Sequence, residues 1–153
     1  MNNANAKWLP VLQPAANSTG AASTAEIDTL GYGYLELLIM LGATDAALSV
    51  LKVVESDTTG DGSAVDITGL VFGTSNTSEG VASVLPAAND DNKAYLFNVD
   101  LKGRKRFLTL KITAGTSTGG VLLAAIARLS RAAVAPKNAA GFNVSQALQC
   151  PAY

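Results

Sequence analysis

The sequence predicts an all-β protein: a single β-sandwich or barrel over residues 26–131, with an extended arm at each end. Three observations predict this class. Apolar and polar residues alternate with a period of two in several short runs, turn residues separate these runs, and no long run has the apolar period of a helix. The 153 residues fit one domain, and 48% of them are hydrophobic, which is enough for one core without disulfides.

Residues 1–25 are predicted to form the first arm. They are rich in small and polar residues, and Pro10, Pro14 and Gly20 disfavour a long helix. One apolar island interrupts this segment, and it either docks on a neighbouring molecule or folds onto its own domain. We expect a partner to contact its four largest apolar residues, Trp8, Leu9, Val11 and Leu12.

The domain is predicted to contain seven or eight short strands. The segment 34–41 is apolar on both faces except at Glu36, so we expect it at the centre of a sheet. A short apolar segment at 81–85 ends at Pro86. The expected strands are 26–30, 34–41, 48–55, 65–72, 94–101, 106–113 and 121–129.

Two of these strands, 94–101 and 106–113, alternate most clearly, and the turn of residues 102–105 between them predicts a β-hairpin. The segment 121–129 fits either a helix or a strand. We favour a strand because the segment follows a glycine-rich turn and can pair back onto the sheet.

Residues 132–153 are predicted to form a second arm, because Pro136, Gly141 and Pro151 interrupt the segment. Its apolar anchors are Phe142, Val144 and Leu148.

The composition argues against catalysis. The chain has no histidine, and its single cysteine, Cys150, has no histidine to activate it. Segment 57–62 faintly resembles a calcium loop but lacks the closing glutamate and the flanking helices, so a turn is the simpler interpretation. We expect no enzyme activity, no cofactor and no metal. We also expect synthesis in a cytoplasm, because no apolar run suits a membrane span or signal peptide.

The net charge of −1 hides a separation of charge along the chain, since residues 1–92 sum to −9 and residues 93–153 to +8. Such a separation fits a nucleic-acid or membrane patch, self-complementary subunit contacts, or two halves that interleave and cancel locally. The densest basic cluster fits a phosphate contact, a contact with acidic groups of a partner, or a solvated turn, and no aromatic residue interleaves it to favour nucleic acid. This basic cluster is Lys102, Arg104, Lys105 and Arg106.

Three stretches carry a family resemblance: IDTLGY at 27–32, VLKVVESD at 50–57 and FNVDLKGRKRFL at 97–108. They resemble small virion proteins encoded in the head modules of tailed bacteriophages. The resemblance covers roughly residues 26–131 and leaves both arms unmatched.

The resemblance implies a capsid cement, or decoration, protein. Such a protein is a small β-sandwich, often a jelly roll, that sits on the virion exterior as a homodimer or homotrimer and bridges subunits of the major capsid protein. We expect its contacts from the apolar anchors of both arms and from the basic cluster, with no membrane and no direct nucleic-acid partner. The alternatives are another virion component, such as a head fibre base or a tail module, and a carbohydrate-binding β-sandwich that mediates adhesion.

Overall fold

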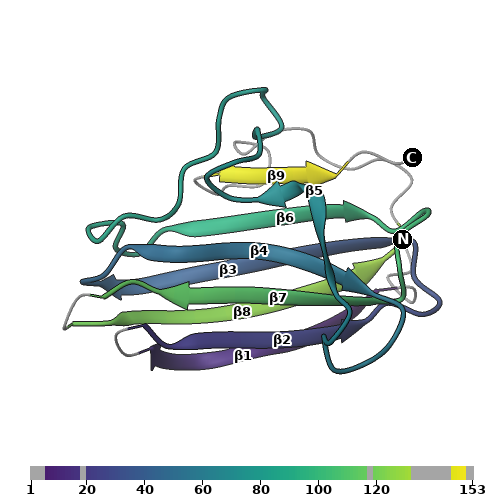
Figure 1. The fold of residues 1–153 in the computed structure, drawn as a ribbon, viewed down its shortest axis with the longest axis horizontal. Coiled ribbons are helices and arrows are strands. Elements are labelled where there is room, and N and C mark those ends of the chain that lie inside the picture. Colours follow the sequence, from purple (N-terminus) through teal and green to yellow (C-terminus); the bar gives the residue numbers. More distant parts are fainter. Residues whose placement is uncertain (1–5, 18–19, 117–118, 132–145, 151–153) are drawn as a thin grey trace.

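The computed structural model describes residues 6–17, 20–116, 119–131 and 146–150, and its regular elements are all β-strands (Figure 1). The described residues contain no helix with the length and apolar character needed to cross a membrane. The strands are β1 (Lys7–Asn17), β2 (Ala22–Asp28), β3 (Tyr34–Thr44), β4 (Leu48–Ser56), β5 (Val65–Val71), β6 (Ala94–Asp100), β7 (Phe107–Ala114), β8 (Val121–Ser130) and β9 (Gln146–Cys150).

The strands form two sheets that pack face to face. Sheet A has the order β1-β8-β3-β6-β9 and sheet B the order β2-β7-β4-β5. Neighbouring strands are antiparallel, except that β9 runs parallel to β6. The predicted β-sandwich is confirmed. The interleaved orders 1-8-3-6 and 2-7-4-5 of the first eight strands are those of two Greek keys, which make a jelly roll.

The core lies between the sheets and consists of the inward-facing residue of each alternating pair. On the central strand β3, the fully buried Leu35, Leu37 and Ile39 face inward. The ring of Phe72, just after β5, packs edge-on against Tyr95 and Phe97 of β6, with centroids 5.6 and 5.3 Å apart. These rings join the two layers at one side of the sandwich.

The N-terminal segment is not an arm. β1 is an edge strand of sheet A and pairs with β8, and β2 is an edge strand of sheet B and pairs with β7. Pro10 and Pro14 do not interrupt β1, because an edge strand needs only half of its N–H groups for pairing. β1 also bulges, with register shifts after Pro10 and after Leu12. The arm prediction for residues 1–25 is therefore wrong for most of this segment, since distant strands supply the pairing that its composition does not reveal.

The predicted hairpin of residues 94–113 is also wrong. β6 pairs with β3 and β9 in sheet A, and β7 pairs with β2 and β4 in sheet B, so residues 102–105 carry the chain between sheets. Alternation defines the face that a strand buries but not its neighbour. The favoured strand at 121–129 is confirmed as β8, although its neighbours are β1 and β3 and not β7.

Residues 146–150, the described part of the predicted second arm, form β9. Its Leu148 is fully buried in the core, so the prediction that this side chain contacts a partner is wrong. The amide of Gln146 also holds Val84, donating to its carbonyl at 3.3 Å and accepting from its N–H at 3.2 Å. The other two predicted anchors, Phe142 and Val144, lie outside the described residues.

Replacing Leu148 by Ala should lower the free energy of unfolding by about 2–5 kcal/mol, because the substitution leaves a cavity in the core. The matched control is Leu30→Ala, at a side chain that is 65% exposed, and it should change stability by less than about 0.5 kcal/mol. Urea denaturation measures both. Equal effects of the two substitutions would contradict the docking of β9 in the core.

Candidate functional site

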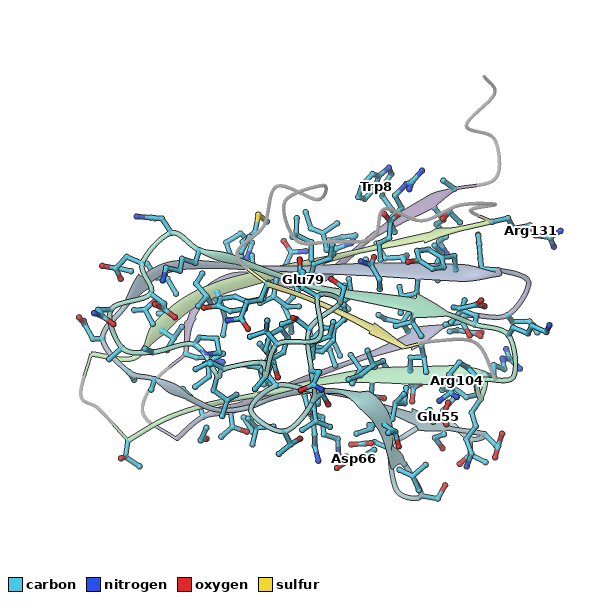
Figure 2. The ribbon with its side chains drawn as sticks, turned by 90° about the horizontal axis from the view of Figure 1, so that it is seen from above. Trp8, Glu55, Asp66, Glu79, Arg104 and Arg131 are labelled. Carbon is cyan, nitrogen blue, oxygen red and sulfur yellow. The ribbon has the colours of Figure 1, made fainter. Side chains whose placement is uncertain are left out.

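Carboxylates of the same molecule neutralise most of the predicted basic cluster. The side chain of Arg104 is only 3% exposed, and its Nη1 lies 3.4 Å from Glu55 Oε1 (Figure 2). The other oxygen of Glu55 accepts the backbone N–H of Lys105 at 3.1 Å. Because Glu55 belongs to β4 of sheet B and Arg104 follows β6 of sheet A, these contacts fix the crossing between the sheets.

Two further members of the cluster are also paired. Lys105 Nζ lies 3.1 Å from Asp57 Oδ2, and Arg106 donates from Nε and Nη2 to the two carboxylate oxygens of Asp28, at 2.9 and 2.7 Å. Hydrogen bonds from Arg106 and from the Leu30 N–H lower the pKa of Asp28 to about 2. Of the four cations, only Lys102 has no ion pair with a described residue.

The separation of charge along the sequence corresponds to interleaving in the fold. Seven ion pairs join described residues, and in six of them a base from residues 93–131 meets an acid from residues 1–92. The two halves of the chain therefore cancel each other locally, which was one of the three interpretations that the sequence left open.

The loop of residues 57–64 packs over the outer face of sheet B. Its Asp61 pairs with Lys111 Nζ of β7 at 2.7 Å, and its Gly60 N–H donates to Glu26 of β2 at 3.0 Å. Asp61, which belongs to the segment that resembles a calcium loop, thus forms an ion pair with Lys111. Nowhere in the part of the chain that the structure describes do three or more His, Cys, Asp or Glu side chains gather as metal ligands would.

Of the four predicted contact residues of β1, only Trp8 is well exposed, at 65%. It projects from the outer face of sheet A (Figure 2). Its ring lies 5.6 Å from the guanidinium carbon of Arg128, which forms an ion pair with Glu36. The other three are partly buried against the chain's own core: Leu9, Val11 and Leu12.

The outer face of sheet A is apolar over β1, β8 and β3. The strand register places Pro10, Ile126 and Leu38 side by side, and along the strands follow Met40 and Leu122, which are 37% and 43% exposed. On β6 the outward-facing Leu96 and Asn98 are buried, so the open part of the face lies over the other three strands. A solvated sheet usually carries polar residues outward, and an apolar face of this kind indicates a contact surface.

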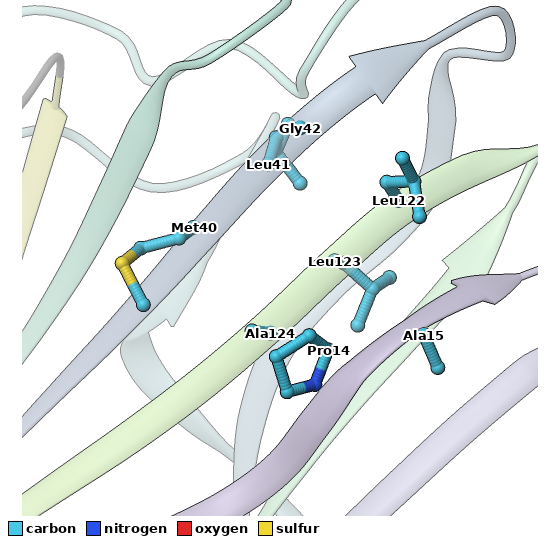
Figure 3. Close-up of a pocket in the computed structure, with 8 residues that line it drawn as sticks. All are labelled: Pro14, Ala15, Met40, Leu41, Gly42, Leu122, Leu123 and Ala124. Carbon is cyan, nitrogen blue, oxygen red and sulfur yellow. The ribbon is translucent and has the colours of Figure 1, made fainter.

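A shallow apolar pocket of about 300 Å³ opens on this face, and we call it the sheet A pocket (Figure 3). It forms where β1 bulges away from β8 and where Gly42 has no side chain; a Cβ there would lie 3.1 Å from the Cβ of Leu122. The volume is that of roughly ten waters, enough for one large side chain. Its lining is Pro14, Ala15, Met40, Leu41, Gly42, Leu122, Leu123 and Ala124.

A second apolar surface lies on the loop of residues 72–93 between β5 and β6, which extends beyond the edge of the sandwich (Figure 1). Hydrogen bonds hold this loop in place: the Thr77 N–H donates to the Val81 carbonyl at 2.7 Å, and the Ser83 N–H to the Ser75 carbonyl at 2.9 Å. The side chains of Val81 and Val84 are nevertheless 64% and 63% exposed.

The exposed apolar residues Met40, Leu122, Val81 and Val84 were not predicted as surface candidates from the sequence. The one available signal for the two valines was the short apolar segment at 81–85 inside a polar loop.

No family model and no curated protein matches this chain. Among solved structures, it is similar to a β-porphyranase of glycoside hydrolase family 86 from the human gut bacterium Bacteroides plebeius, with a TM-score of 0.39 and 15% identity. The match covers 85% of this chain and 21% of the enzyme, so the chain spans about one fifth of the length of that protein. A likeness at this level carries no argument about activity.

Replacing Arg104 by Ala removes the charge partner of Glu55, whose side chain is only 14% exposed. We expect a loss of about 3–5 kcal/mol in the free energy of unfolding, as for other buried pairs with one partner removed. Lys102→Ala, in the same loop, should cost less than about 0.5 kcal/mol. Chemical denaturation that finds similar losses for both would refute the structural role of Arg104.

The carboxyl of Asp28 should titrate with a pKa of about 2, and Arg106→Gln should return it towards 3.8. Because the folded pKa lies below the ordinary value, the pair stabilises the fold above pH 3.8, and this contribution disappears as the pH falls through about 2. Side-chain NMR titration measures the pKa, and Lys102→Gln serves as the control. An Asp28 pKa that is the same in the parent and in Arg106→Gln would contradict the bidentate pair.

Proposed function

We propose that this chain is a structural virion protein that decorates and cements the capsid of a tailed bacteriophage by bridging subunits of the major capsid protein. In this proposal the chain works on the virion exterior by binding, and it catalyses no reaction. The resemblance of residues 97–108 to head-module proteins suggests this role. The observation that carries it is the ordered loop 72–93, which holds the exposed Val81 and Val84.

Such a loop suits binding to a shell. Its hydrogen bonds and the Gln146 clamp on Val84 fix the loop before it meets a partner, so binding costs little conformational entropy. Burying each valine contributes about 1.5 kcal/mol or more. A chain that contacts two neighbouring capsid subunits gains further from the second contact, because that contact becomes intramolecular.

The jelly roll is compatible with this role. Viral capsid proteins use the architecture, and lectins and cupins use it as well, so the fold supports the proposal only together with the exposed loop. Ion pairs hold the crossing loop and the loop of residues 57–64 on sheet B, which keeps the body of the protein rigid.

The test is co-sedimentation of the purified chain with empty shells assembled from the major capsid protein of the genome that encodes it. The chain should pellet with the shells and saturate. Val81→Ser combined with Val84→Ser should weaken binding roughly a hundredfold, because about 3 kcal/mol of apolar burial is lost. The control is Val65→Ser on β5, at a side chain that is 48% exposed.

A parent chain that stays in the supernatant would refute the cement function. Equal binding by the parent and by the double valine variant would refute the role of the loop.

A further inference from the structure

The outer face of sheet A carries a protruding side chain and a pocket at different heights along its strands. Trp8 lies beside Arg128 of β8, and the sheet A pocket centres near Leu123 of the same strand. Their separation is about 17 Å at the rise of a β-strand. Trp8 therefore cannot fill the pocket of its own molecule, although the indole is 65% exposed and the pocket has room for one large side chain.

A second copy of the chain can place its Trp8 in this pocket and at the same time receive Trp8 of the first copy in its own pocket. A two-fold axis in the plane of the face, crossing the strands near the row of Ile126 and Leu38, exchanges the position of Trp8 with that of the pocket. The strands of the two copies then run antiparallel, and each Trp8 lies over the pocket of the other copy. In a two-fold interface every contact occurs twice in this way.

Unpaired charges at the two ends of sheet A fit the same axis. Arg131 follows β8 at one end, where it donates to the Gly31 carbonyl at 3.2 Å, whereas Asp45 follows β3 at the other, close to Asp91, which accepts the Thr44 N–H at 2.7 Å. None of these three charges forms an ion pair with a described residue. The axis brings Arg131 of each copy over the two acids of the other, which favours this orientation over a parallel one.

We propose that two copies of this chain associate through the outer face of sheet A, with Trp8 of each copy seated in the sheet A pocket of the other. This contact adds a second copy as a partner to the proposed shell binding. It uses a surface different from the loop 72–93, so either proposal can fail while the other stands.

Trp8 is the single tryptophan of the chain, so its fluorescence reports directly on the contact. On the full chain, sedimentation should show a monomer–dimer equilibrium, and the emission should shift to the blue over the same concentration range. Trp8→Ala should weaken the dimer thirtyfold or more, as expected for a central aromatic anchor. Leu30→Ala, at an equally exposed side chain on the loop after β2, should leave the dimer and the blue shift unchanged.

A charge exchange tests the orientation without removing the indole. Arg131→Asp and Asp45→Arg should each weaken the dimer, and the double variant should restore it, because the two charges meet only between copies. In one molecule they lie at opposite ends of the sheet, about 30 Å apart. Failure of the double variant to recover the dimer would overturn the proposed axis.

Three other results would overturn the proposal. The chain could remain monomeric, with an emission that does not depend on concentration. This result is expected if residues of the same chain, or the shell alone, cover the outer face of sheet A. The chain could instead form a dimer that Trp8→Ala does not weaken, or sediment as a trimer. The chain with both Val81→Ser and Val84→Ser should still dimerise, and Trp8→Ala should still bind shells, which separates this test from that of the shell contact.

Discussion

The structure depends on pairing between the beginning and the end of the chain. β1 pairs with β8 and β2 with β7, so the first residues complete both sheets only after the last long strands are in place. The ion pairs also join residues that are far apart in the sequence: Arg106 pairs with Asp28, and Arg104 pairs with Glu55. Neither half can bury its apolar faces alone, and folding must close long loops before these contacts form.

The positions of most strands could be predicted from the sequence, but not which strands pair with each other. The expected strands from 34–41 to 121–129 correspond to β3 to β8, and period-two alternation was clearest in β6 and β7. β3 was apolar on both faces, and β8 also fitted a helix. Alternation could not show that residues 102–105 cross between sheets, since a strand has the same alternation whichever neighbour it pairs with. The N-terminal segment was misjudged for a related reason: Pro10 and Pro14 are poor in a central strand and acceptable at an edge, and edge position is a property of the whole fold.

The surfaces were harder to predict than the strands. The basic cluster could be found by counting charges, but its neutralisation by Asp28, Glu55 and Asp57 depends on a crossing that only the structure reveals. The apolar residues of β3 on both faces were read as burial at the centre of a sheet. That position is correct, yet Met40 still reaches the surface, because no described loop covers this part of sheet A as residues 57–64 cover sheet B.

The proline-containing edge strand β1 also sets how far association can proceed. A proline offers no N–H to an incoming strand, and the bulges of β1 remove the straight register that strand addition needs. A neighbouring molecule therefore cannot extend sheet A from this side by backbone pairing. This edge of sheet A is thereby protected against the open-ended strand addition that builds fibrils.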